Sequence, residues 1–512
     1  MNKRMVSMTA GLATAAFVVV SMLPVTVQAG RLSESSPRTG NVIFMHPDGA
    51  GVNHWMAARM YWYGPDASMN YDKLPAMAIY RGHMLDELTG TSNGGATTHA
   101  FGYKVEARGS FGKDGDGDAS RLIKSLSGFN GSIMREAAAK GHPVGIVNDG
   151  NIGEPGTGAF LAEVPNRNDW DAIVLQIWDG RPGSKDPRPH VIMGGGERQF
   201  LPPGVQGVHG EGENKLLGSR NLISEALEAD YVVLRTREEF EELRAQLEIS
   251  PTYAPKVLGL FAHHHIFNDR PEEVLIATGY YTGTLPLTNT KESELVLYGT
   301  PVITPAGFNP PTVAEMTEVA ITILDRVSKE VDKPFFLISE TESVDNFGNN
   351  DNAIGVLTAL KHADDAIGVA LDYLGGEPNT LLLLAADSDA GGMQVRALQG
   401  PLTQTVTTVN FNPTGVEAEQ INAKIDGLYG RDSFAFVSEP DQFGQQWPFA
   451  ITWIGTPDVA GGILVRAAGL NSDLITAAFS ERFDNIDVYR MIYLTLFGRL
   501  LPYPEGKLAP SR

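Results

Sequence analysis

The 512-residue sequence contains no cysteine. Disulfide bonds, thiol catalysis and zinc–thiolate sites are therefore excluded, and stability must come from packing and from any bound ions. Hydrophobic residues make up 42% and charged residues 20% of the chain, which excludes a disordered or fibrous protein. The length allows one large α/β domain with insertions, or two to three ordinary domains.

Positive charge is scarce. The chain has 40 Lys and Arg residues against 61 Asp and Glu residues, for a net charge of -21. Such an acidic chain is not expected to bind nucleic acid. The excess acids can serve solubility, or some of them can cluster to hold cations, and only the motifs can separate these two interpretations.

Long apolar runs are absent except near the start. Lys3 and Arg4 precede an apolar stretch at residues 17–20, and small residues at 27–29 resemble a cleavage site. Polar residues and Pro24 interrupt the run, which favours cleavage over a membrane anchor. We expect a signal peptide over residues 1–29 and a mature domain over 30–512. The mature protein would be periplasmic or secreted, with no stable membrane insertion after signal cleavage.

Apolar runs typical of buried strands alternate with helical patterns along the rest of the chain. This alternation predicts an α/β fold with a largely parallel central sheet flanked by helices on both faces. Residues 279–311 are rich in Thr, Pro and Gly without clear periodicity, and we expect an irregular insertion there. The expected strands cover residues 41–46, 143–147, 190–193, 334–338 and 380–386, and the expected helices cover 54–62, 132–140, 313–327 and 353–374.

Four acidic residues follow these strands closely: Asp48, Glu340, Asp345 and Asp387. Singly, each could be a helix cap or a turn residue. In parallel sheets, however, ligands bind beyond the carboxyl ends of the strands. Four acids at equivalent strand ends therefore predict one shared site.

Five ordered segments resemble the alkaline phosphatase family over most of the chain. They are residues 48–51 followed by 57–59, the glycines at 194–196 followed by Phe200, residues 257–261, residues 314–317, and residues 336–337 leading into Glu340 and Asp345. The resemblance implies an alkaline phosphatase-like fold and hydrolysis of small phosphate monoesters at a metal cluster. It leaves open whether the chain forms a homodimer.

The resemblance also implies a serine or threonine nucleophile at the start of a helix. Counting back from Gly102 and Lys104 in the segment 90–104 places the nucleophile at Ser92, with Thr91 in reserve. A hydroxyl at a helix start meets free N–H groups that suit a phosphoryl oxygen. The alternative is that Ser92 only caps the helix. The family usually has an aspartate where Thr91 stands.

A metal-binding acid and a phosphate-binding arginine follow from a second matching segment. Residues 147–152 resemble the strand and turn before the family's acid, which falls at Glu154, and the family's spacing from that acid leads to Arg167. A planar guanidinium can hold two phosphate oxygens at once. The alternative is an exposed loop cation, and the departure at Thr91 leaves the orientation of Arg167 open.

Metal ligands are where the chain departs most from the family, whose members typically bind two zinc ions and a magnesium. Where histidines are expected, the chain has Asn349, Ser388 and the segment 443–445, and no histidine follows His362. Oxygen ligands suit magnesium, calcium or manganese better than zinc. We therefore expect one of these three ions, although the family implies zinc. The matching ligands are Asp48, Glu154, Glu340, Asp345, Asn349 and Asp387.

Other candidate ligands fit less well. Structural or surface roles are expected for His54, His99 and the triplet 263–265, the triplet being the least improbable source of an imidazole. Asp114, Asp116 and Asp118 resemble a calcium loop, but such a loop needs a glycine at its sixth and a glutamate at its twelfth position. The chain has neither, so we interpret this segment as a solvated turn.

Three functions remain open from the sequence. The favoured one is an extracytoplasmic phosphomonoesterase that forms a phosphoenzyme on Ser92. The second is a phosphodiesterase or sulfatase-like hydrolase. The third is a family member that binds phosphate or cations without turnover, which the missing histidines keep open.

Overall fold

The computed structural model describes residues 38–114, 121–268, 309–398, 425–428, 430–431, 435–477, 483–506 and 508–512. The expected signal peptide and most of the expected insertion lie outside these ranges. Ser36–Arg512 form one compact unit. Among the described residues, no helix is both long enough and apolar enough to cross a membrane.

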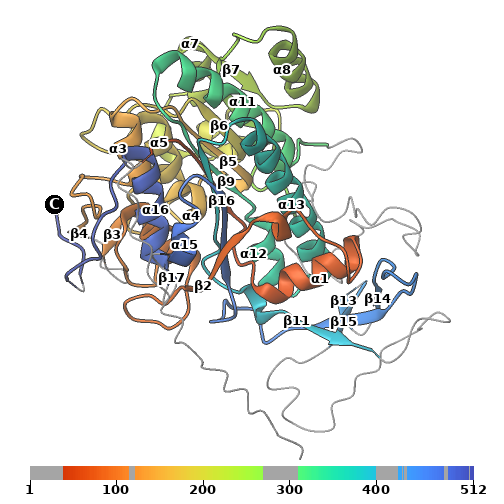
Figure 1. Cartoon of the computed structure of the whole chain (residues 1–512). Helices are drawn as coiled ribbons and strands as arrows, with labels where there is room; N and C mark the ends of the chain where they lie inside the picture. Colours follow the sequence, from red (N-terminus) through yellow and green to blue (C-terminus); the bar gives the residue numbers. More distant parts are fainter. Residues whose placement is uncertain are drawn as a thin grey trace, which may run out of the picture. The chain divides into compact units, whose positions relative to one another are not determined.

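A ten-stranded sheet forms the centre of the unit (Figure 1). Seven neighbouring strands within it run parallel, which confirms the predicted sheet. In spatial order they are β10 (Thr380–Leu384), β1 (Asn41–His46), β9 (Phe336–Glu340), β5 (Val144–Asn151), β6 (Val191–Gly195), β8 (Lys256–Leu260) and β7 (Tyr231–Leu234). All residues of β10, β1, β9 and β5 are buried, as strands covered on both faces must be.

One edge of the sheet departs from the parallel pattern. Strand β16 (Leu464–Gly469) runs antiparallel to β10 and to β2 (Ala76–Arg81), and β17 (Phe483–Asp484) completes the edge beside β2. A five-stranded sheet, which the sequence did not predict, contacts helix α1 (Val52–Trp62) through β11. Its strands are β11 (Gln394–Ala397), β12 (Ile425–Gly427), β13 (Gly430–Arg431), β14 (Phe436–Val437) and β15 (Pro448–Thr452).

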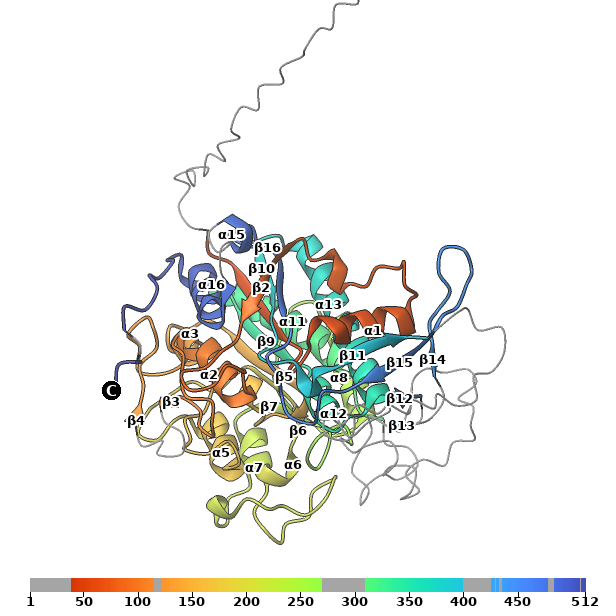
Figure 2. The ribbon, with the colours of Figure 1, turned by 90° about the horizontal axis from the view of Figure 1, so that it is seen from below.

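Helices cover both faces of the central sheet, as predicted (Figures 1 and 2). On one face, α11 (Val313–Val331) packs on β5 and β9, and α13 (Ala353–Gly376) packs on α11 and β10. Helix α1 (Val52–Trp62) packs on α13. On the other face, α16 (Asn485–Phe497) packs on β1 and on α2 (Ser92–Phe101), while α4 (Pro155–Gly158) packs on β9 and β5.

Shorter helices complete the unit. They are α3 (Ile133–Ala139), α5 (Trp170–Asp179), α6 (Glu197–Phe200), α7 (Leu222–Glu228), α8 (Arg237–Ile249), α12 (Ser343–Gly348) and α15 (Leu474–Ala477), with a hairpin of β3 (Lys113–Asp114) and β4 (Arg121–Leu122). Asp114 thus ends a short strand, whereas Asp116 and Asp118 lie outside the described residues.

The strand register brings the polar strand ends together. His46 is paired with Glu340 across β1 and β9, and Asn148 is paired with Glu340 across β5 and β9. On the other side of β1, Met45 is paired with Leu384 near the end of β10. The segments that follow β10, β1, β9 and β5 therefore all start at the carboxyl ends of these neighbouring strands, which is where ligands of parallel sheets bind.

Candidate metal centre

Asp48 occupies the turn between β1 and α1, and a glycine makes this turn possible. Gly49 has a φ of +68°, in the left-handed region that favours glycine. A Cβ atom at this position would also lie 2.8 Å from Oδ1 of Asp345. The turn therefore brings the segment that carries Asp48 against the start of α12, which carries Asp345.

Two groups of potential ligands overlap at Asp48. One consists of His46, Asp48 and Glu340, and the other of Asp48, Glu342 and Asp345. Within each group, one donor atom of every residue lies within 4.8 Å of the others. All five residues are buried, so Asp48 could contribute to two neighbouring ion positions.

The carboxylates of these groups lack the partners that buried charges require. Both oxygens of Asp48, Glu342 and Asp387, and Oε1 of Glu340, have no N–H or alcohol partner among the described residues. Burial, followed by repulsion from neighbouring acids, raises the pKa of Asp48, Glu340, Glu342 and Asp345 well above the usual range. Cations would compensate these charges, and carboxylate oxygens suit hard divalent ions. The residues present therefore fit a divalent metal centre.

Asp387 joins the centre from the end of β10. Its burial opposes ionisation, but its interaction with the carboxyl group of Asp48 and the nearness of His46 lower its pKa. Asp48 and Asp387 therefore titrate as a coupled pair and not independently. The neighbouring Ser388 is buried as well, and its hydroxyl has no partner among the described residues.

The first turn of α2 lies against Asp387. A Cβ atom at Gly95 would lie 2.5 Å from the Cβ of Asp387, so only glycine allows this approach. Ser92 is the first residue of α2 and is 2% exposed. The cap is Thr91, whose hydroxyl accepts a hydrogen bond from Gly94 N at 3.3 Å and donates one to Ala107 O at 2.5 Å. Capping is thus performed by Thr91 and not by Ser92.

Glu154 and Arg167 lie next to the acids from β9. Nη2 of Arg167 is 3.5 Å from Oε2 of Glu154, and the Arg167 side chain is 32% exposed. Burial opposes its charge, but Glu154 and then Glu342 raise the pKa of Arg167. The guanidinium therefore faces the acid cluster while part of it reaches solvent, and Glu154 is the acid that it contacts.

Asn349 connects Asp345 to a residue that the sequence analysis missed. Its Nδ2 donates hydrogen bonds of 3.0 Å to both carboxylate oxygens of Asp345 and one of 3.0 Å to Oδ1 of Asp458. Burial and then repulsion from Asp387 raise the pKa of Asp458. Asp458 therefore belongs to the same cluster of charges.

The segment 443–445 was wrongly matched to the family's late histidine signature. Phe443 is 78% exposed, and its segment forms a turn on the side chain of Asp441. The late part of the chain reaches the centre through Asp458 instead, in the loop after β15. A polar residue in an aperiodic loop gives no signal that could have identified it.

Two further members of the cluster were also missed. His46 was interpreted only as the last residue of an apolar strand, and its pairing with Glu340 depends on strand register. Glu342 lies between Glu340 and Asp345, so their close spacing was a signal that could have identified it.

The histidines that were considered as substitute ligands lie in different surroundings. Nε2 of His54 is 3.1 Å from Ala390 O, and Nε2 of His99 is 2.7 Å from the hydroxyl of Tyr80, so both have hydrogen-bond partners in the core. Of the triplet, His265 reaches the centre, with Nε2 at 2.6 Å from Oε1 of Glu154.

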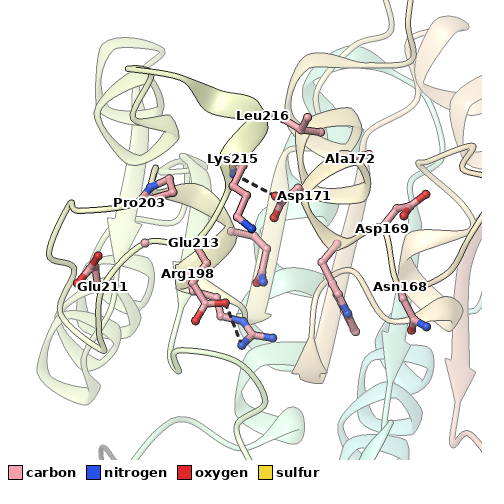
Figure 3. A pocket seen from close by; sticks show the side chains of 13 residues that line it. Asn168, Asp169, Asp171, Ala172, Arg198, Pro203, Glu211, Glu213, Lys215 and Leu216 are labelled. Atoms are coloured by element: carbon pink, nitrogen blue, oxygen red, sulfur yellow. Dashed lines mark hydrogen bonds and ion pairs between the residues drawn. The ribbon is translucent and has the colours of Figure 1, made fainter.

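A pocket of about 920 Å³ is lined in part by Asn168, which follows Arg167 in the sequence (Figure 3). Trp170 lines it and also contacts the rings of His264 and His265, with centroids 5.1 and 6.4 Å away. Charged side chains form part of the lining, and Arg198 is paired to Glu213 at 3.2 Å. Its lining also includes Asn168, Asp169, Asp171, Gln199, Glu211 and Lys215.

Comparisons with known proteins agree with this arrangement. The family model described as alkaline phosphatase matches residues 39–434. A membrane-bound alkaline phosphatase of Bombyx mori is 25% identical over 68% of this chain, and the match spans 60% of that enzyme. Streptomycin-6-phosphate phosphatase of Streptomyces griseus is 26% identical over 72% of this chain and 79% of its own length.

Solved structures show the same fold. The alkaline phosphatase of Thermus thermophilus aligns with a TM-score of 0.59 at 16% identity, over 94% of this chain and 96% of that one. The alkaline phosphatase of the Antarctic bacterium TAB5 aligns with a TM-score of 0.56 at 18% identity, over 90% and 98% of the two chains. On its sequence match, its sheet and its cluster of acids, the chain belongs to the alkaline phosphatase family.

Proposed function

We propose that this protein is an extracytoplasmic, metal-dependent phosphomonoesterase that acts through a phosphoenzyme on Ser92. The observation that carries the proposal is the cluster of buried carboxylates without N–H or alcohol partners among the described residues, which packs against the first turn of α2 through Asp387. The positively charged start of a ten-residue helix and a partly exposed arginine accompany this cluster. Together they form an anion-binding surface beside a cation-binding one.

The cations would be held by the acids at the strand ends. Mg²⁺, Ca²⁺ or Mn²⁺ suits these ligands better than Zn²⁺ because most of the donor atoms are carboxylate oxygens. When bound, such ions supply positive charge to phosphoryl oxygens and lower the pKa of a nearby hydroxyl. The proposed ligands are Asp48, Glu154, Glu340, Asp345, Asn349 and Asp387, with Glu342 and Asp458 added by their positions in the cluster.

Ser92 and Arg167 would perform the chemistry on the substrate. Ser92 Oγ attacks phosphorus and its proton passes to water, while the bond from phosphorus to the leaving-group oxygen breaks as the bond to Oγ forms. The leaving-group oxygen takes up a proton from water and departs as an alcohol. A water molecule then attacks the phosphoserine, the bond from phosphorus to Oγ breaks, Oγ regains a proton, and phosphate is released. Arg167 would hold two phosphoryl oxygens in both steps, because its planar guanidinium presents paired donors.

The substrate is proposed to be a small phosphorylated molecule. The pocket beside Trp170 is large enough for the group that leaves from phosphorus, and the charged side chains in its mixed lining offer that group polar contacts. Export is supported by the charge, apolar run and cleavage pattern of residues 1–29.

A panel of chromogenic esters tests the proposal. Purified protein in a mixture of divalent metals should hydrolyse a phosphate monoester at least about a hundredfold faster than a diester or a sulfate ester. A diester presents only two free oxygens to the site, and a sulfate ester presents three free oxygens but carries one negative charge in place of two. Preference for the diester or the sulfate ester would support the second class of hydrolase. No turnover of any ester, with phosphate still bound, would indicate a non-catalytic binding protein.

A further inference from the structure

His46 ends a strand in which the four residues before it are apolar. It is the last residue of β1, follows Val42–Met45 and is 1% exposed. Its ring packs at 5.6 Å from the rings of Phe44 and His99. A polar ring in such surroundings is costly unless both of its nitrogens have partners.

One nitrogen of His46 has a partner that identifies the tautomer. Nδ1 lies 2.8 Å from the carbonyl oxygen of Ala385. A carbonyl oxygen can only accept, so Nδ1 carries the hydrogen and donates it. A neutral imidazole carries a hydrogen on only one of its two nitrogens. The other nitrogen, Nε2, is therefore left with a free lone pair.

This lone pair is directed at carboxylates and not at a donor. Nε2 has no hydrogen-bond partner among the described residues and lies 3.8 Å from Oδ1 of Asp48. That distance is too long for a shared proton. It agrees with two ligands of one ion, because atoms that are each about 2.1 Å from a metal lie at most about 4.2 Å apart. Oε1 of Glu340, the third member of the group, also lacks a partner among the described residues.

We propose that Nε2 of His46 is a nitrogen ligand of a cation that Asp48 and Glu340 also bind. The centre would then have one mixed nitrogen–oxygen position, in place of the oxygen-only set expected from the sequence. The hydrogen bond from Nδ1 to a backbone carbonyl is the arrangement that orients metal-binding histidines. The inference rests on the proposed metal dependence, but it does not require that the protein turns over a substrate.

A nitrogen ligand changes which ions this position selects. Imidazole raises the affinity for transition metals relative to magnesium and calcium, whereas the group of Asp48, Glu342 and Asp345 offers oxygen only. The two positions should therefore differ in metal preference, with Mn²⁺ accepted at both and Mg²⁺ or Ca²⁺ favoured at the second.

Pulsed electron paramagnetic resonance on the Mn²⁺-loaded full chain tests the proposal. The wild type should show modulation from a directly bound ¹⁴N nucleus, and this signal should disappear in His46→Gln. It should persist in His142→Gln, a control whose Nδ1 lies 2.7 Å from the carbonyl oxygen of Pro334 in another part of the core. The Mn²⁺ affinity of His46→Gln should fall about tenfold or more.

Two results would overturn the assignment: no nitrogen coupling in the wild type, or loss of the coupling in His265→Gln with His46→Gln unaffected. If His46→Gln does not fold, ¹⁵N-histidine labelling of the wild type, combined with His99→Gln and His265→Gln, still identifies the source. Nitrogen coupling without ester hydrolysis would count against the proposed function alone. Ester hydrolysis without nitrogen coupling would count against this inference alone.

Discussion

Asp48 is the residue shared by both ligand groups, whereas Asp345 belongs to one of them. Asp48→Asn should therefore weaken binding at two ion positions, and Asp345→Asn at one, by about tenfold or more each. Equilibrium dialysis with Mn²⁺ followed by metal analysis measures both affinities. The exposed Asp473 provides a matched control, and Asp473→Asn should bind like the wild type. Equal effects of Asp48→Asn and Asp345→Asn would argue against a shared ligand.

Arg167 faces the acid cluster with part of its side chain open to solvent. Arg167→Ala should raise the inhibition constant for inorganic phosphate about tenfold or more, because a charge-assisted hydrogen-bond pair is lost. Arg167→Lys should recover part of this loss, since it restores the charge but not the paired donors.

The matched control for Arg167 is Arg108→Ala, which removes a largely exposed arginine paired with Glu87. Phosphate inhibition that stays unchanged in Arg167→Ala would remove this residue from the site. If urea unfolding shows that Arg167→Ala lowers the free energy of unfolding, Arg167 instead stabilises the fold.

At the start of helix α2, adjacent residues are proposed to have different roles: Thr91 caps the helix and Ser92 acts as the nucleophile. Thr91 caps the helix, so Thr91→Ala should lower the free energy of unfolding by about 1 kcal/mol. Ser92→Ala should change that free energy by less than about 0.5 kcal/mol, yet lower kcat at least about a thousandfold because the nucleophile is gone. Urea unfolding of both variants measures the free energies of unfolding, and a monoester assay measures their kcat values. Near-normal turnover in Ser92→Ala would direct attention to Thr91.

Asp186 ties α3 to the segment after α5. Its carboxylate accepts hydrogen bonds from Nε and Nη2 of Arg181 at 2.7 and 2.8 Å, and Nε of the buried Arg135 lies 3.6 Å away. Burial opposes ionisation, but these cations hold the pKa of Asp186 well below its usual range. The stabilisation is therefore complete above an unfolded-state pKa of about 3.9 and is lost as pH falls below it.

Asp186→Asn should lower the free energy of unfolding at pH 7 by about 3 kcal/mol, because two buried arginines lose their shared partner. The difference from the wild type should shrink as pH falls below about 3.9, where the unfolded state takes up the proton and the folded state does not. Asp179→Asn, which breaks a half-exposed pair with Arg220, should cost less than about 1 kcal/mol. A difference between Asp186→Asn and the wild type that does not vary with pH would show that packing, and not charge, makes the contribution.

For the whole molecule, the sequence predicted what depends on local pattern. The apolar runs at residues 41–46 and 380–386 were sufficient to place buried strands, and their order implied a parallel sheet. Asp48, Glu340, Asp345 and Asp387 were selected because strand ends converge at one edge. The clustering of these acids is a consequence of β10, β1 and β9 being neighbours.

What depends on pairing between distant segments could not be predicted. The antiparallel edge requires β16 to return beside β10, and the contact between Asn349 and Asp458 joins residues more than a hundred positions apart. The inference that His46 binds a metal ion depends on its contact with the carbonyl oxygen of Ala385 and on the strand register, neither of which the sequence shows. Sequence pattern describes faces and ends of elements, but it does not describe which elements meet.

The fold explains part of the chain's net charge of -21, because several acids lie in the core without N–H or alcohol partners among the described residues. A protein of this kind is expected to bind cations. We propose that those cations enable the hydrolysis of phosphate monoesters. The most direct test is to remove all metal with a chelator and to add single ions back while monoester hydrolysis is followed. Restored activity with Mn²⁺, Mg²⁺ or Ca²⁺, and none with Zn²⁺ alone, is the predicted result. Activity that survives complete metal removal, or that only Zn²⁺ restores, would contradict it.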